Sequence, residues 1–129
     1  MVKFLSDDWF KKVDELTKAA GDLQIPKALK DVVVNLTISS DLGDIKMCMN
    51  GGIMQKGHVE KADVDMSMPA EYAYKILIKG DWGMGMKGWV ARKIKLSGNM
   101  RKMMPLKTHK PSNPQEELRK KIDANTDAL

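Results

Sequence analysis

The sequence predicts a single α+β domain. Its 129 residues fit one domain, and a chain of this length buries about two thirds of its unfolded surface. Apolar residues recur with helical spacing near the start of the chain and again at residues 69–79. Five segments between residues 31 and 97 have the pattern of strands. The first four of these strands follow one another without a helix between them, which is typical of an α+β fold.

The first helix is predicted over residues 6–20. Ser6 is a candidate N-cap, and the two acids that follow it suit the positive end of the helix dipole. One apolar stripe has helical spacing: Trp9, Val13, Leu16 and Ala20. Gly21 favours an end to the helix at that point.

Alternation of apolar and polar residues predicts the strands at 31–39, 45–50, about 53–60 and 62–68. The apolar faces of the first, second and fourth consist of Val32, Val34, Leu36 and Ile38, then Ile45, Met47 and Met49, then Val64, Met66 and Met68. A turn at 41–44 makes the first two a hairpin. Four strands in succession predict an antiparallel meander.

A second helix, over residues 69–79, is apolar around most of its girth. Its charged residues, Glu71, Lys75 and Lys79, lie on one narrow stripe. A surface helix usually buries a stripe somewhat wider than 100°. We therefore expect this helix to insert between two layers or to line a cavity, and Gly80 to end it.

Residues 81–91 mix glycines with large apolar side chains, which predicts a loop and a short, weakly stable helix. Such a segment is either a lid or an irregular core-packing loop, and the pattern favours neither. A last strand is predicted at 93–97, followed by a short apolar helical turn at 100–106. A final helix from Asn113 to about Ala124 has a sparse apolar stripe, Leu118 and Ile122, and is expected to dock weakly or to move.

The composition excludes several classes of protein. The net charge is +5, but basic residues are not interleaved with stacking aromatics, so nucleic acid is not expected as a partner. A lone cysteine, two acids near the N-terminus and short apolar runs predict a cytoplasmic protein without a secretion signal or membrane span. The 11 methionines suit either a core or an adaptable apolar binding surface.

No catalytic, cofactor or metal site is predicted. His58 and His109 lack metal-ligand spacing, and Cys48 has no neighbouring histidine or cysteine motif. The G-x-G-x-x-G run at 83–88 follows a helix, whereas a nucleotide-binding fold needs it after a strand. Asp63 and Asp65 share the exposed face of a strand, where solvation is the simpler account. We expect a protein that is not an enzyme.

The order and spacing of several segments resemble the sterol carrier protein 2 (SCP2) family. Ala62-Asp63-Val64-Asp65-Met66-Ser67-Met68 is similar to a family strand that leads into a helix. Ile78-Lys79-Gly80-Asp81 resembles the end of that helix, and Ile94-Lys95-Leu96-Ser97-Gly98-Asn99 resembles the last family strand. The Met100–Leu106 turn matches the apolar segment that trails it. The resemblance covers about residues 30–106.

The resemblance implies a five-stranded, mostly antiparallel mixed sheet with helices on one face, enclosing an apolar tunnel. Residues 1–106 would be the lipid-binding domain, and 107–129 a linker with a C-terminal helix that docks or moves. The implied ligand is a fatty acid, fatty acyl-CoA, sterol or other lipid, bound without a reaction. The expected tunnel lining is Met66, Tyr72, Ile76, Leu77, Met84, Met86, Trp89 and Met103.

Partners other than a lipid are less defined. Lys79, Lys87, Arg92, Arg101, Lys102 and Lys107 are candidates to steer an anionic headgroup, although most are expected to be solubility charges. We expect at most transient contact with a membrane surface and leave a homodimer open. The alternative function is an accessory or dimerisation module for lipid metabolism, with an exposed Leu118/Ile122 stripe and the 100–106 turn as its interface. The C-terminal residues do not match a peroxisomal signal.

Overall fold

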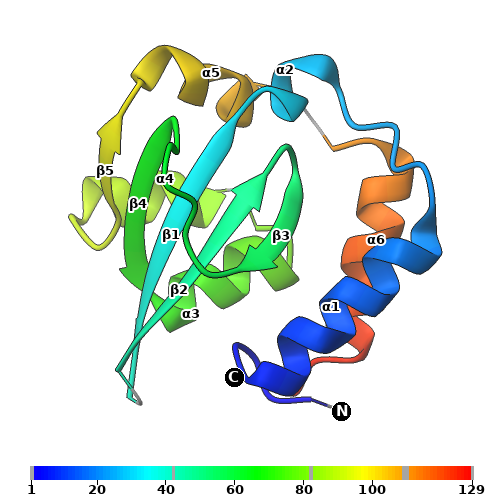
Figure 1. Ribbon diagram of the computed structural model, residues 1–129. Helices are drawn as coiled ribbons and strands as arrows, with labels where there is room; N and C mark the ends of the chain where they lie inside the picture. The colour runs from blue at the N-terminus through cyan, green and yellow to red at the C-terminus, as the bar shows by residue number, and fades with distance from the viewer. Residues whose placement is uncertain (1, 42, 82, 109–110, 129) are drawn as a thin grey trace.

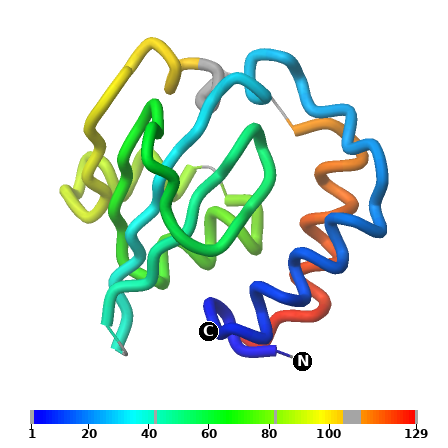
Figure 2. Tube along the Cα trace, viewed as in Figure 1, coloured from blue at the N-terminus to red at the C-terminus, as the bar shows by residue number. Residues whose placement is uncertain are grey.

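The computed structural model of the protein describes residues 2–41, 43–81, 83–108 and 111–128, with side chains throughout except at 105–108. Figures 1 and 2 show a sheet with helices packed behind it and beside it. The elements in chain order are α1 (Asp7–Ala20), α2 (Lys27–Lys30), β1 (Val33–Ser40), β2 (Gly43–Asn50), β3 (Ile53–Lys56), β4 (Val64–Pro69), α3 (Ala70–Ala73), the π-helical turn η1 (Tyr74–Ile78), α4 (Gly83–Val90), β5 (Lys95–Gly98), α5 (Met100–Thr108) and α6 (Asn113–Ala124).

The sheet has five strands in the order β3-β2-β1-β4-β5. Neighbouring strands are antiparallel except β1 and β4, which are parallel. This confirms the predicted five-stranded, mostly antiparallel mixed sheet. The predicted four-strand meander is wrong in its last step, because β4 returns to pair with β1 and not with β3. The alternation of apolar and polar residues within a strand does not determine which strand it pairs with.

The crossover between β3 and β4 passes in front of β1 in the view of Figure 1. The Asn35 side chain, buried on that face, exchanges two hydrogen bonds of 2.9 Å with the backbone N–H and C=O of Val59. The imidazole Nε2 of His58 lies 2.9 Å from the carbonyl oxygen of Leu36. The predicted third strand therefore ends early, at Lys56, and the chain after it is fixed by side chains.

The apolar faces predicted from alternation form one continuous surface of the sheet. Ile38 lies opposite Ile45 in the antiparallel register, and Leu36 lies between Met47 and Met66. Val32, Val34, Leu36 and Ile38 are all buried, as their spacing predicts. The helices cover this face of the sheet, where the core is packed.

Helix α1 carries the aromatic part of the core. The Ser6 hydroxyl accepts a hydrogen bond from the Trp9 backbone N–H, which confirms the predicted N-cap. The Trp9 ring meets the rings of Phe4 and Phe10 edge-on, each at a centroid distance of 5.0 Å. Phe4 also packs edge-on against Tyr74, which joins α1 to η1.

The predicted helix over 69–79 is divided into α3 and the π-helical turn η1. The Lys79 N–H donates to the Tyr74 carbonyl oxygen at 3.2 Å, five residues back along the chain. Most of the apolar surface of this helix is buried, as predicted. The buried residues include Ala73, Tyr74, Ile76 and Ile78. This segment packs against strands β1 and β4 and against helices α4 and α6. Among the described residues, no helix has the length and apolar character needed to cross a bilayer.

Gly98 and Gly43 provide a matched pair of substitutions, because their φ angles are +110° and +103°. A Cβ on Gly98 would lie 2.5 Å from the carbonyl oxygen of Asp63, whereas a Cβ on Gly43 would meet nothing within 4 Å beyond its chain neighbours. Gly98→Ala should therefore lower the free energy of unfolding by about 1–3 kcal/mol more than Gly43→Ala. Urea unfolding measures the difference, and equal losses would contradict the requirement for close approach between β4 and β5.

Candidate functional site

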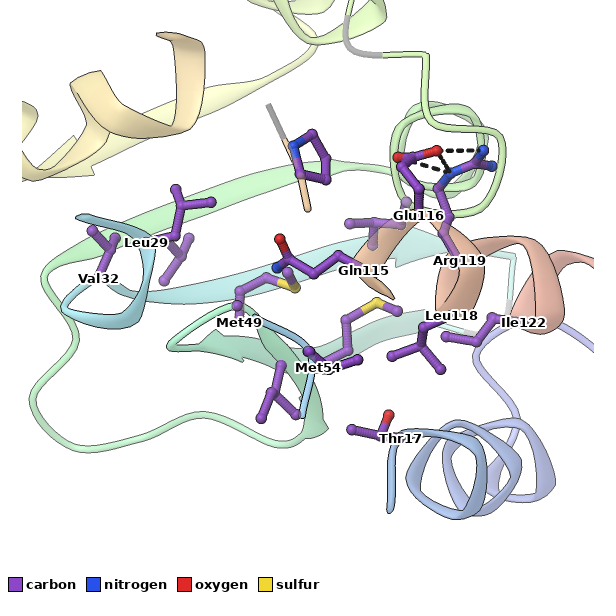
Figure 3. A pocket seen from close by; sticks show the side chains of 16 residues that line it. Thr17, Leu29, Val32, Met49, Met54, Gln115, Glu116, Leu118, Arg119 and Ile122 are labelled. Atoms are coloured by element: carbon purple, nitrogen blue, oxygen red, sulfur yellow. Dashed lines mark hydrogen bonds and ion pairs between the residues drawn. The ribbon is translucent and has the colours of Figure 1, made fainter. Parts of the chain in front are cut away.

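A cavity of about 130 Å³ lies between the sheet and helix α6 (Figure 3). Its walls come from α1, the 23–32 segment, the β1–β3 strands, η1 and α6, so segments from both ends of the chain are needed to form it. The lining residues are Thr17, Leu23, Leu29, Val32, Val34, Met49, Gly52, Ile53, Met54, Leu77, Pro111, Gln115, Glu116, Leu118, Arg119 and Ile122.

The floor of the cavity is a row of apolar side chains across three strands. Val34 on β1 pairs with Met49 on β2, and Met49 pairs with Met54 on β3. Because directly opposite residues point to the same face of a sheet, the three side chains lie next to one another. Figure 3 shows the Met49 and Met54 side chains extending toward α6. Two flexible thioethers give this floor an adaptable shape.

Helix α6 forms the roof of the cavity. Leu118 and Ile122 point toward the floor, and Leu77 from η1 also lines the cavity. Ile122 is only 2% exposed, and Leu118 is partly buried against the core. The exposed Leu118/Ile122 interface proposed for the alternative function is therefore wrong. Leu118 and Ile122 lie on the inner face of α6, where both line the cavity.

Polar interactions tie α6 to the rest of the fold. The Arg119 guanidinium donates to the Ile78 carbonyl oxygen at 2.8 Å, where the η1 turn ends. Lys79 forms an ion pair with Asp123 at 2.9 Å, and this hydrogen-bonded carboxylate raises the pKa of Lys79. The pair is partly exposed, so it adds little stability.

Both ends of α6 are also held. At the start, the Ser112 side chain and Gln115 form a capping box, and the Ser112 hydroxyl donates to the Leu23 carbonyl oxygen. Beyond the end, the Thr126 hydroxyl accepts a hydrogen bond of 2.9 Å from the Trp9 indole N–H. α1 and α6 run antiparallel side by side (Figures 1 and 2), so the roof is continuous with the aromatic core.

The cavity as it stands suits a small apolar group. Of its polar side chains, Gln115, Glu116 and Arg119 come from α6 and Thr17 comes from α1, and the Arg119 guanidinium is already paired with the Glu116 carboxylate at 3.0 Å. Sites for drug-sized ligands usually enclose about 300–1,000 Å³. The cavity is therefore smaller than such a site.

Of the eight residues predicted to line a tunnel, the cavity contains Leu77. Met66 is half-buried on β4, and Met103 is buried on α5, which packs against β4. Tyr72 and Ile76 face the inner side of α4, where Met84 is half-buried. The last two predicted residues, Met86 and Trp89, are about half exposed. A tunnel that joins these residues to the cavity stays a prediction.

Sequence periodicity missed most of the cavity lining. Met49 was on the predicted apolar face of the second strand, but alternation gave no sign that its neighbours would leave a space. Met54 lies on the short edge strand β3, where the pattern is weakest. The apolar pair Leu118 and Ile122 was the available signal from α6.

The groups considered for chemistry have structural roles or lie apart. Cys48 is buried on the other face of the sheet, and burial raises the pKa of its thiol. The glycine run at 83–88 lies within α4, after η1, and does not follow a strand. No group of three or more His, Cys, Asp or Glu side chains in the described ranges is placed to hold a metal ion. His109 lies outside the described residues, so the predicted absence of catalysis stays a prediction.

The comparisons with known proteins identify the fold. No protein-family model matches the sequence, and no curated protein matches it. Sterol Carrier Protein 2 from Yarrowia lipolytica superposes with a TM-score of 0.56 at 14% identity, covering 90% of this chain and 98% of its own. Sterol Carrier Protein 2 Like 2 from Aedes aegypti gives 0.53 at 21% identity, covering 77% and 94%.

A third solved structure gives the same result. The sterol carrier protein domain 2 of Helicoverpa armigera has a TM-score of 0.54 at 19% identity, covering 93% of this chain and 91% of its own. The chain therefore has an SCP2-like fold over most of its length, which confirms the resemblance predicted from its motifs.

Proposed function

We propose that the protein binds a lipid, such as a fatty acid, fatty acyl-CoA or sterol, and carries it without a chemical reaction. The observation that carries this proposal is the apolar cavity between the Val34–Met49–Met54 row and α6. The sterol carrier proteins that share the fold support it. Burial of a hydrocarbon chain supplies about 25 cal/mol for each Å² of apolar surface removed from water.

Entry of a lipid would require movement of α6. Polar interactions hold this helix beside its apolar contacts, among them the Arg119 bond to Ile78, the Lys79–Asp123 pair and the bonds at the two helix ends. Each such bond contributes little because water competes for the same groups. The apolar contacts of Leu118 and Ile122 would be replaced by contacts with the ligand, so opening exchanges one apolar surface for another.

A larger side chain in the cavity should weaken lipid binding. Met54→Trp places an indole on the floor beneath α6, and tryptophan suits a strand. We expect its affinity for a fluorescent fatty acid to fall at least tenfold, measured by titration. Met100→Trp makes the same change on α5, where the methionine is exposed and outside the cavity, and should leave the affinity within about twofold.

Thermal unfolding of both variants without ligand separates a blocked site from a damaged fold. A Met54→Trp protein that melts like the wild type and still binds the fatty acid with full affinity would contradict the proposed site. Equal loss of affinity in Met54→Trp and Met100→Trp would also contradict it, because the effect would not depend on the cavity.

The alternative, an accessory or dimerisation module, has lost one of its two proposed surfaces, since Ile122 is buried. Light scattering of the full chain tests what remains: a stable dimer would support the alternative, and a monomer would count against it. A cytoplasmic location and the absence of cofactors and nucleic-acid partners remain predictions.

A further inference from the structure

Helix α4 presents Gly85 and Gly88 to the core and three of its large apolar residues to solvent. Gly88 is buried, and a Cβ there would lie 2.6 Å from the Ile94 side chain and 3.0 Å from the Tyr72 ring. A Cβ on Gly85 would lie 3.9 Å from the end of the Ile76 side chain. The glycines therefore let the helix backbone pack closely on its inner side.

The outer side of α4 carries three large apolar side chains. Met86, Trp89 and Val90 are 51%, 52% and 72% exposed. Their spacing of three and four residues places them on one helix face. Core packing does not explain why large apolar side chains occupy these exposed positions. A cluster of exposed apolar side chains marks an interaction site more often than a single one does.

Three basic residues lie in α4 or directly after it. Lys87 lies within α4, and Arg92 and Lys93 follow its end; all three are exposed. From residue 82 to residue 115 the sequence contains eight Lys and Arg residues and no Asp or Glu, whereas the net charge of the whole chain is +5. The local excess of positive charge therefore concentrates in the segment that also exposes Met86, Trp89 and Val90.

We propose that this outer face of α4, with its basic rim, docks on an anionic lipid bilayer surface. An amphipathic helix with tryptophan and aliphatic residues on one side and Lys or Arg beside them suits the boundary between headgroups and acyl chains. Anionic headgroups attract the rim and the apolar side chains enter the interface. A second copy of the chain fits less well, because pairing two such faces brings like charges together.

The docking face is separate from the cavity. None of Met86, Lys87, Trp89, Val90, Arg92 or Lys93 lines it. Docking can therefore be measured on vesicles without any carried lipid, and its result does not depend on whether the cavity binds a fatty acid. Docking through α4 would bring the protein next to the membrane, which is a source of the lipid that it is proposed to bind.

Vesicle binding tests the proposal. We expect the full chain to bind phosphatidylcholine vesicles that contain 30% phosphatidylserine, and to bind pure phosphatidylcholine at least tenfold more weakly. Neutralising one basic residue at the surface lowers partitioning about fivefold, so Arg92→Gln/Lys93→Gln should lower it about 25-fold. Lys120→Gln/Lys121→Gln removes the same charge from the exposed surface of α6 and should change it less than about twofold.

A second variant tests the apolar part of the face. Val90→Ser leaves the net charge unchanged and alters a side chain that is 72% exposed, so the fold should be unaffected. It should lower binding to anionic vesicles about three- to tenfold. Absence of wild-type binding to anionic vesicles would overturn the proposal, as would equal losses from the two double variants or full binding by Val90→Ser. Self-association through this face without vesicle binding would assign it to a second copy instead.

Discussion

Replacing Trp9 with alanine is expected to lower the free energy of unfolding by about 3–5 kcal/mol. The Trp9 side chain is fully buried, packs edge-on against Phe4 and Phe10, and donates its indole N–H to Thr126. Its removal leaves a large void in the core beside α1 and also removes the hydrogen bond to Thr126. Domains of this kind unfold with about 5–15 kcal/mol, so the loss is a large share of the total.

Urea unfolding followed by circular dichroism measures this loss without relying on tryptophan fluorescence. Trp9→Phe keeps most of the apolar volume and removes the indole N–H, and should cost about 1–3 kcal/mol. Trp89→Ala makes the same truncation at a half-exposed position and should cost less than half as much as Trp9→Ala. Similar losses at Trp9 and Trp89 would contradict the placement of the aromatic core.

Ile122→Ala is expected to have the second-largest effect, a loss of about 2–4 kcal/mol in the free energy of unfolding. Ile122 is buried in the roof of the cavity, so the substitution enlarges that space. A lipid would then displace α6 less on entering. Saturating fatty acid should therefore raise the unfolding midpoint of Ile122→Ala by more than it raises that of the wild type.

Ile94→Ala is the matched control. Ile94 is 4% exposed and packs near Gly88 of α4, away from the cavity. Its truncation should cost a similar amount of stability, but fatty acid should raise its midpoint no more than it raises that of the wild type. If fatty acid shifts the midpoints of Ile122→Ala and Ile94→Ala equally, the ligand does not use the cavity under α6.

The sequence predicted the elements whose pattern depends on a single buried face. Val32, Val34, Leu36 and Ile38 alternate because one side of β1 packs against helices, and their burial follows directly. The wide apolar girth of residues 69–79 likewise predicted a helix that inserts between two layers or lines a cavity. Motif order and spacing then predicted the SCP2-like fold, even though each motif is short.

The pairing of strands and the shape of the space between layers were not predictable from periodicity. The crossover that leads β4 back to β1 is held by hydrogen bonds of Asn35 and His58, and a buried asparagine carries no signal of its partner in the sequence. The π-helical turn at Tyr74 also has no signature in the apolar pattern. The cavity depends on how Met49, Met54 and Ile122 pack across three distant segments, which is a property of the assembled fold.

Methionine methyl groups provide the most direct test of the central claim, that a lipid binds between β2–β3 and α6. The protein can be labelled with ¹³C at its methionine methyls, whose NMR signals are assigned by single Met→Leu substitutions and followed during titration with a fatty acid. Met49 and Met54 line the cavity, whereas Met66, Met84 and Met103 lie outside it. We predict the largest shifts, and contacts with the acyl chain, at Met49 and Met54. Shifts confined to Met66, Met84 and Met103, with Met49 and Met54 unchanged, would contradict the proposed site.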